Sequence, residues 1–213
     1  MRYMIWPMMT LLAACGGGGG GGAPVTTDPP RAPVTPGTPT TPGQPQSQMD
    51  VARAALIATY TNPTIYTALS DVPTSGGAVY SGYVAGQLAN TSDSITDTLV
   101  GDLQMNVTFN ATSVAVTGTI SGFMDSDNDP LSGQMTLSRG SLDRGGNPAA
   151  DATLLMTATG SLRDDAGRTL VIGTQLEGDF LGTRYDAVGG EMLGRVTVNG
   201  VDQDFDGGFI AER

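Results

Sequence analysis

The chain has 213 residues with 10 basic and 21 acidic side chains, which gives a formal net charge of -11. A surface this acidic repels the phosphates of nucleic acid, so we expect no nucleic-acid partner. The chain has no histidine, which excludes a His-dependent catalytic triad and a His-dependent zinc site.

Residues 1–15 have the pattern of a bacterial export signal. Arg2 supplies a positive charge, and Met4–Leu12 is an apolar run of about nine residues, far short of the roughly twenty that span a membrane. Leu12-Ala13-Ala14-Cys15 resembles the lipobox of bacterial lipoproteins, in which the cysteine receives lipid. We therefore predict attachment to a membrane through Cys15, with an ordinary cleaved signal or a buried segment as the alternatives.

Residues 16–48 are rich in glycine, proline and threonine and contain almost no large apolar side chain. Such a segment buries too little surface to offset its ordering entropy, so we predict a disordered tether. Its reach is roughly 100 Å when fully extended and nearer 30 Å as a flexible coil. A proline-rich ligand for an aromatic groove is the weaker interpretation.

Residues 49–75 are predicted to form a short helix and a lead-in to the next domain. Asp50 is placed to cap the alanine-rich run Val51–Ala58, and Pro63 ends it. We expect the apolar residues of this helix to cover one end of the following sheet. A membrane-surface helix is the alternative, but the basic face that anionic lipid requires is missing.

From residue 76 to residue 213 the pattern alternates between apolar and polar residues and is interrupted by turn signals. Leu103, Met105, Val107 and Phe109, for example, alternate with polar neighbours, as in a half-buried strand. We predict eight strands: Ala78–Leu88, one around Leu103–Phe109, one around Val114–Ser121, Leu131–Leu142, Ala152–Leu162, Thr169–Leu181, Ala187–Val198 and Gln203–Ala211.

Turn chemistry and strand glycines together predict how these strands are arranged. Asn199-Gly200 is a strong signal for a two-residue hairpin, and the other connections are short enough for hairpins. A meander of eight strands has two free edges, which closure removes. Glycines at strand positions, such as Gly82 and Gly118, suit strong curvature. We predict an all-β fold, an eight-stranded antiparallel up-and-down barrel rather than a sandwich, whose interior is filled or holds one small ligand.

The last strands resemble a known family. Gly178-Asp179-Phe180-Leu181-Gly182, Ala187-Val188-Gly189-Gly190 and Gly207-Gly208-Phe209-Ile210-Ala211 follow the order seen in transferrin-binding protein B-like barrels, and Gly77–Gly82 resembles the first barrel strand of that family. The resemblance implies an outer-membrane lipoprotein, displayed on the cell surface, that binds a host or environmental protein or a haem-type ligand. The chain has no handle domain, so transferrin recognition does not carry over.

Loops on a rigid scaffold are where binding residues concentrate, so we predict ligand contacts in residues 125–131, 142–147 and 163–168 at one end of the barrel. The candidate residues are Asp125, Asp127, Asp129, Arg144, Arg163 and Asp164. We predict no cofactor, although haem is retained as a candidate ligand. The alternative function is a structural envelope lipoprotein whose filled barrel holds no small ligand.

We predict neither a metal site nor an enzyme. Asp202–Gly207 matches the first half of an EF-hand loop, but Arg213 stands where the bidentate acid belongs. Residues 125–129 have similar spacing without the required glycine, which leaves at most a weak surface cation site. Glu177, Asp179 and Glu191 could supply paired carboxylates, yet nothing indicates the water-poor cleft that glycosidase chemistry needs, so we expect a solvated strand face.

Overall fold

The computed structural model describes residues 45–61, 65–90, 94–142, 144 and 152–213. The predicted signal, Cys15, the tether up to residue 44 and Pro63 lie outside these residues. The elements in chain order are α1 (Gln46–Thr61), the short 3₁₀ helix η1 (Leu69–Asp71), β1 (Gly76–Ala89), β2 (Ile95–Phe109), β3 (Val114–Met124), β4 (Ser132–Leu142), β5 (Thr153–Arg163), β6 (Thr169–Leu181), β7 (Ala187–Val198) and β8 (Val201–Glu212).

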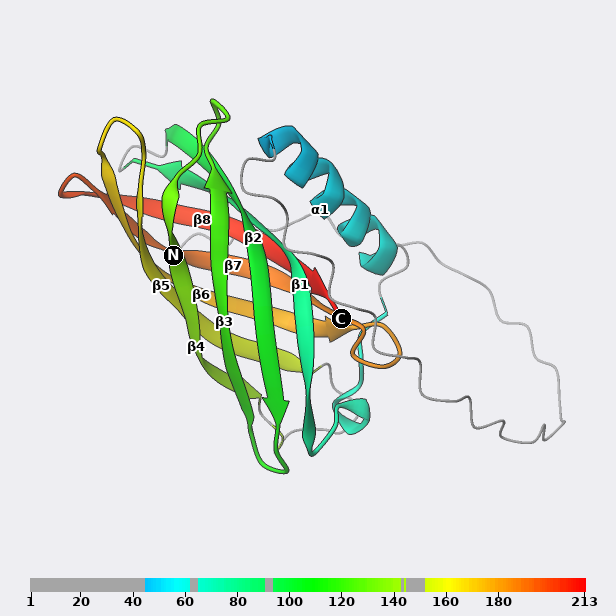
Figure 1. The fold of residues 1–213 in the computed structure, drawn as a ribbon. Coiled ribbons are helices and arrows are strands. Elements are labelled where there is room, and N and C mark those ends of the chain that lie inside the picture. Colours follow the sequence, from blue (N-terminus) through cyan, green and yellow to red (C-terminus); the bar gives the residue numbers. More distant parts are fainter. Residues whose placement is uncertain (1–44, 62–64, 91–93, 143, 145–151) are drawn as a thin grey trace, which may run out of the picture. The chain divides into compact units, whose positions relative to one another are not determined.

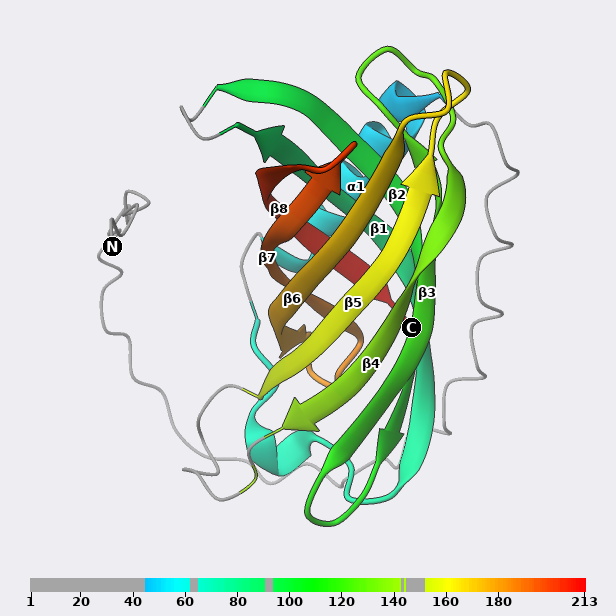
Figure 2. The same ribbon diagram turned by 90° about the vertical axis from the view of Figure 1, so that its left-hand side faces the viewer.

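The eight strands form a closed antiparallel barrel in sequence order, as predicted (Figure 1). Each strand pairs with the next, and β1 closes the barrel by pairing with β8 from Ser81–Glu212 to Ala89–Asp204. Figure 2 shows β4, β5 and β6 crossing the wall at a slant, the tilt that closure of a twisted sheet requires.

Alternation along each strand separates an apolar interior from a polar outer wall. In β6, for example, Leu170, Ile172 and Leu176 are buried while Gln175 and Glu177 are exposed. Buried apolar side chains from all eight strands belong to one continuous cluster, which includes Phe205 and Phe209 of β8. The outer wall is therefore mainly polar, with exposed apolar side chains at single positions such as Val171 on β6.

Helix α1 begins at Gln46, so the prediction that Asp50 caps it is wrong. The backbone carbonyl of Pro45 accepts hydrogen bonds from the N–H groups of Gln48 and Met49, at 2.9 and 3.3 Å. Asp50 lies inside the helix, where its carboxylate is 3.9 Å from the Nε of Arg53. The early start places Met49 against the barrel, and Met49 is the helix residue that is fully buried.

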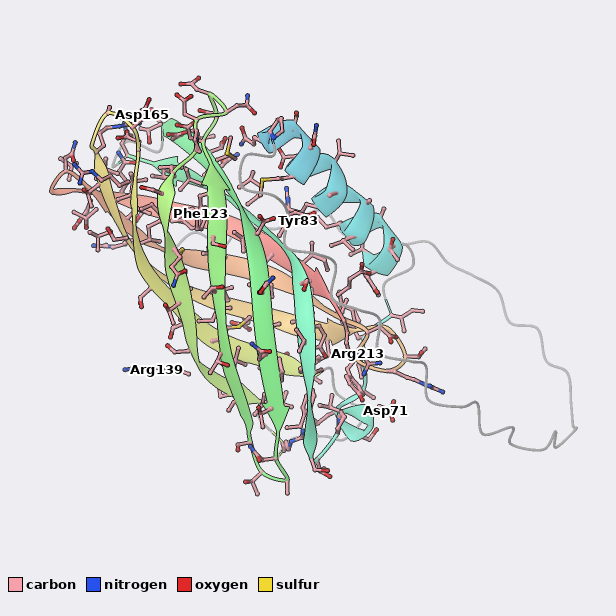
Figure 3. All side chains as sticks on the ribbon, in the orientation of Figure 1. Asp71, Tyr83, Phe123, Arg139, Asp165 and Arg213 are labelled. Atoms are coloured by element: carbon pink, nitrogen blue, oxygen red, sulfur yellow. The ribbon has the colours of Figure 1, made fainter. Side chains whose placement is uncertain are left out.

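The helix lies along the outer wall beside β1, β2 and β8, and it does not cover an end of the sheet as predicted (Figure 1). Met49 packs with Val100 and Met124, and Figure 3 places Tyr83 on the wall facing the helix. Farther along, Leu56, Ile57 and Tyr60 pack against three outward apolar residues, Leu181, Ala187 and Ile210. The helix covers the side because these outward positions form an apolar stripe on an otherwise polar wall.

The lead-in between α1 and β1 closes one end of the barrel. Leu69 and Val72 insert into the interior cluster. Thr67 is buried, and its backbone N–H donates to the Phe180 carbonyl at 2.8 Å, while its own carbonyl accepts from Ala152 N–H at 3.3 Å. The lead-in is thus bonded to the start of β5 and the end of β6, and we call this end of the barrel the floor end.

No helix in the described part of the chain is long and apolar enough to cross a membrane.

Candidate functional site

The meander assigns every loop to one of two ends. The β1–β2, β3–β4, β5–β6 and β7–β8 connections lie at one end, which we call the loop end, and the other connections lie at the floor end with the lead-in. Figure 3 shows Asp165 at the loop end and Asp71 at the floor end. The predicted residues Asp125, Asp127, Asp129, Arg163 and Asp164 therefore come together at the loop end.

Arg144 does not belong to this group, so the prediction that it lies at the same end of the barrel as the candidate aspartates is wrong. Residues 143 and 145–147 of the predicted segment lie outside the described residues. The β4–β5 connection must lie at the opposite end from the β3–β4 and β5–β6 connections, because antiparallel hairpins alternate between the ends of a meander. The Arg144 guanidinium donates to the backbone carbonyls of Val72 and Pro73, at 3.3 and 2.5 Å. Arg144 therefore fastens the lead-in to the floor end.

The β3–β4 loop is organised by the Asp125 carboxylate, which is buried against its own loop. Its Oδ1 accepts from the backbone N–H groups of Asp127 and Asp129, at 3.0 and 2.9 Å. Asn128 takes a left-handed conformation with φ of 65°, which closes the turn. Asp97 on β2 fastens the loop from outside, because its Oδ1 accepts from the N–H and hydroxyl of Ser126 at 3.2 and 2.8 Å.

The β5–β6 loop repeats this architecture. Asp164 is buried, its Oδ1 accepts from the backbone N–H of Arg168 at 2.6 Å, and Gly167 takes the left-handed position with φ of 84°. In both loops the first residue also donates its N–H to the carbonyl of the fifth, Asp125 to Asp129 at 3.1 Å and Asp164 to Arg168 at 3.2 Å. Both aspartate side chains thus stabilise their own turns by accepting hydrogen bonds from backbone N–H groups of the loop.

A third loop uses the same bonds. Asn90 donates its backbone N–H to the Ser94 carbonyl at 3.0 Å, and its Oδ1 accepts from the Ser94 N–H at 3.2 Å. The shared signal is an Asp or Asn directly after one strand, which bonds to the residue four positions later, before the next strand begins. The two aspartate loops add Asn or Gly at the fourth position. Side-chain acceptance of loop N–H groups explains why Asp and Asn are preferred there.

The fifth residue makes the two aspartate loops electrostatically different. The side-chain hydrogen bond from Arg168 lowers the pKa of Asp164, and the same bond raises the pKa of Arg168. At the equivalent position the other loop carries Asp129. Loss of hydration, followed by the charges of Asp125 and Asp165, raises the pKa of Asp129. The β5–β6 loop is thus partly neutralised, and the β3–β4 loop keeps its negative charge.

The loop end is therefore an acidic surface built on rigid turns. Sequence reasoning missed Asp97, because no spacing pattern connects this residue of β2 to the β3–β4 loop. Asp165 and Arg168 lie in the predicted segment 163–168 but were not among the named candidates. Among the described residues there is no group of three acidic or sulfur-containing side chains placed to hold a metal ion. The chemistry offered at this end is charge attraction to a cationic surface.

The other carboxylates considered as catalytic lie on the outer wall. Glu177 and Glu191 are direct cross-strand partners on β6 and β7, and both are exposed. Asp179 accepts a hydrogen bond from the Thr153 hydroxyl at 2.6 Å. Within the EF-hand-like segment, Asp202 accepts from the Thr197 hydroxyl at 2.7 Å. These side chains occupy a solvated strand face.

The barrel interior is the second place where a ligand could bind. Met105, Met135, Met156 and Met192 are buried among the interior side chains, where their flexible thioethers fill space between branched residues. The buried polar side chain in the middle of the inner face is Thr174, whose hydroxyl bonds to the Ala158 carbonyl at 3.4 Å. The described interior offers no charged group to orient a ligand.

Comparison of the chain with protein-family models, with curated proteins and with solved structures finds no match.

Proposed function

We propose that this protein is an outer-membrane lipoprotein, displayed on the cell surface, that binds a protein ligand with the outside of its barrel and catalyses no reaction. The observation that carries the proposal is the occupied interior, where apolar side chains from all eight strands form one buried cluster. Because the chain's own side chains take this space, a ligand meets the loops and the wall. Surfaces of this kind suit macromolecules better than small molecules.

The sequence supports the location. Leu12-Ala13-Ala14-Cys15 resembles a lipobox, and residues 16–48 have the composition of a tether that holds a domain away from a bilayer. The resemblance of the last strands to transferrin-binding protein B-like barrels adds the expectation of surface display. Haem is the less favoured candidate ligand, because several buried side chains would have to leave the barrel interior to make room for it.

The occupied interior also favours a second candidate, a structural envelope lipoprotein that binds no ligand. The two candidates differ in whether the exposed surface recognises anything. A partner that binds the barrel with micromolar or tighter affinity supports the binding function, and its absence supports the structural one.

The first experiment tests the anchor and the display. Cells that produce the full chain or its Cys15→Ser variant are grown with labelled palmitate, and intact cells are then treated with protease. We expect label on the unsubstituted chain alone, and we expect its barrel to be digested from outside. Label on both chains, or complete protection of the barrel, contradicts this part of the proposal.

The second experiment tests the ligand class. The full chain with Cys15→Ser is immobilised and exposed to serum and to spent culture medium, and haem is titrated separately while its absorbance is recorded. We expect a reproducible protein partner and no stoichiometric haem band. Stoichiometric haem binding without a protein partner would show that the ligand class is wrong.

A further inference from the structure

We infer that the partner-binding surface lies at the floor end and is centred on Ile65, Tyr66 and Arg184, which we call the floor patch. This inference rests on the proposed function, because it locates the contact surface of an anchored binding module. It differs from the sequence-based prediction, in which two of the three candidate segments, residues 125–131 and 163–168, lie at the loop end.

The described chain enters the domain at the loop end of the barrel. The backbone N–H of Gln46 donates to Asn128 Oδ1 at 2.9 Å, and its side-chain Nε2 donates to Thr98 Oγ1 at 3.1 Å. These bonds hold the start of α1 against the β3–β4 loop. The described chain therefore begins at the loop end.

The helix then carries the chain along the wall to the other end. Its 16 residues span about 24 Å at 1.5 Å per residue. Near its end the Tyr60 hydroxyl donates to Glu212 at 3.2 Å. In the proposed lipoprotein, a domain tethered at its loop end would keep that end nearer the membrane on average, which would present the floor end outward.

Two apolar side chains at the floor end are exposed and are carried by a backbone that is held in place. Ile65 and Tyr66 are 48% and 49% exposed. The Ile65 carbonyl accepts from Gly182 N–H at 2.7 Å, and Tyr66 forms a β-bridge with Leu181. Because Thr67 is bonded on both sides, this exposed pair loses little conformational freedom when a partner covers it.

The floor patch also carries a positive charge, on Arg184. Arg184 lies in the β6–β7 loop, which wraps around the lead-in, because the Thr67 hydroxyl donates to the Gly182 carbonyl at 2.6 Å and accepts from Tyr185 N–H at 3.2 Å. Arg184 is exposed, and its guanidinium makes no ion pair with a residue that the structure describes. Tyrosine and arginine are the residues most enriched where binding energy concentrates. The floor patch therefore fits a protein with an apolar pocket bordered by carboxylates.

The test uses intact cells that produce the full chain with the photo-crosslinker p-benzoylphenylalanine in place of one residue. Tyr66 is the test position. Ser126 reports on the loop end, and Leu193, which is 50% exposed on β7, reports on the side wall. Illumination in serum or spent medium is followed by measurement of the masses of the crosslinked products. Far-ultraviolet circular dichroism of each purified variant checks the fold.

We expect one discrete product of a different protein at Tyr66 and none at Leu193, and we expect Arg184→Glu to weaken the product at Tyr66 by about tenfold. A product at Ser126 instead of Tyr66 overturns the floor patch and leaves the binding function standing. The absence of products at every position overturns both. A product with the mass of two copies of this chain, or equal products at Tyr66 and Leu193, also overturns the inference.

Discussion

At the scale of single residues, Thr67 shows how one buried polar side chain joins separate elements. It makes backbone bonds to β6 and to Ala152 at the start of β5, and its hydroxyl bridges Gly182 and Tyr185 in the β6–β7 loop. No local pattern indicates this role, because a threonine between two short elements resembles any loop residue. Its partners are more than 80 positions away in the chain, so the pattern of neighbours cannot reveal them.

We expect Thr67→Val to lower the free energy of unfolding by about 1–3 kcal/mol, because it leaves the Gly182 carbonyl and the Tyr185 N–H without their partner. Thr67→Ser keeps the hydroxyl and should cost less than about 1 kcal/mol. Urea unfolding of the full chain with Cys15→Ser measures both. Equal losses for the two variants would mean that the methyl group and not the hydroxyl holds the floor.

The two aspartate loops are expected to respond to pH in opposite directions. The pKa of Asp164 is lowered in the folded state, so its contribution to stability is present above the unfolded pKa of about 3.9 and is lost as the pH falls through the folded pKa. The pKa of Asp129 is raised, so its ionised form is disfavoured by folding. Raising the pH through the pKa of Asp129 therefore costs stability.

Asparagine variants separate these effects. Asp164→Asn should lower the melting temperature at pH 7 and have a smaller effect at pH 3, where the carboxylate approaches protonation. Asp129→Asn should raise the melting temperature at pH 7 and change little at pH 3. Thermal unfolding at pH 7, 5 and 3 is the measurement. A loss of stability in Asp129→Asn at pH 7 would contradict the sign of its pKa shift.

At the scale of elements, alternation predicted the bounds of the strands more accurately than the cap signal predicted the start of the helix. Thr169–Leu181 and Ala187–Val198 coincide with β6 and β7 because inward residues on a barrel strand must be apolar at every second position. The helix starts four residues before Asp50, since burial of Met49 against Val100 and Met124 extends it. A tertiary contact of this kind is invisible in local sequence.

Met49 is therefore the residue on which the docking of α1 depends. We expect Met49→Ala to detach α1 while the barrel stays folded, because no other side chain of this helix is fully buried. Amide exchange in residues 46–61 should rise at least about tenfold, with strands β3 to β7 unchanged. Val51→Ala is the matched control, since Val51 is 71% exposed on the same helix. Faster exchange throughout the barrel would show that α1 is part of its folding unit.

At the scale of the whole molecule, the sequence predicted the closed barrel but wrongly grouped Arg144 with candidate residues at the opposite end of the barrel. Closure followed from eight alternating segments joined by short turns. Successive turns of a meander alternate between its two ends, and this rule can be applied to the sequence alone. It places Arg144 and Asp125 at opposite ends of the barrel. What the sequence could not supply was the attachment of α1 to the β3–β4 loop, because Gln46, Thr98 and Asn128 meet only after the barrel closes. The proposed outward orientation of the floor end rests on that attachment.

Closure itself depends on close backbone approach where β1 meets β8. A Cβ added to Gly82 would lie 2.0 Å from the Ile210 carbonyl oxygen and 2.5 Å from the Ala211 Cα, both backbone atoms that cannot move unless the two strands separate. We expect Gly82→Ala to cost about 3 kcal/mol, at the upper end of overpacking penalties. The loss of amide protection should begin in β1 and β8.

Gly173→Ala is the matched control, because an added Cβ there has no neighbour within 4 Å. This variant should be neutral or stabilised by up to about 1 kcal/mol through the lower entropy of the unfolded chain. If Gly82→Ala also proved neutral, the β1–β8 contact would be adaptable and the barrel could not be treated as a rigid body. In a barrel that is not rigid, the position of the loop end would no longer set the orientation of the floor end. This substitution therefore tests the geometry on which the floor patch depends.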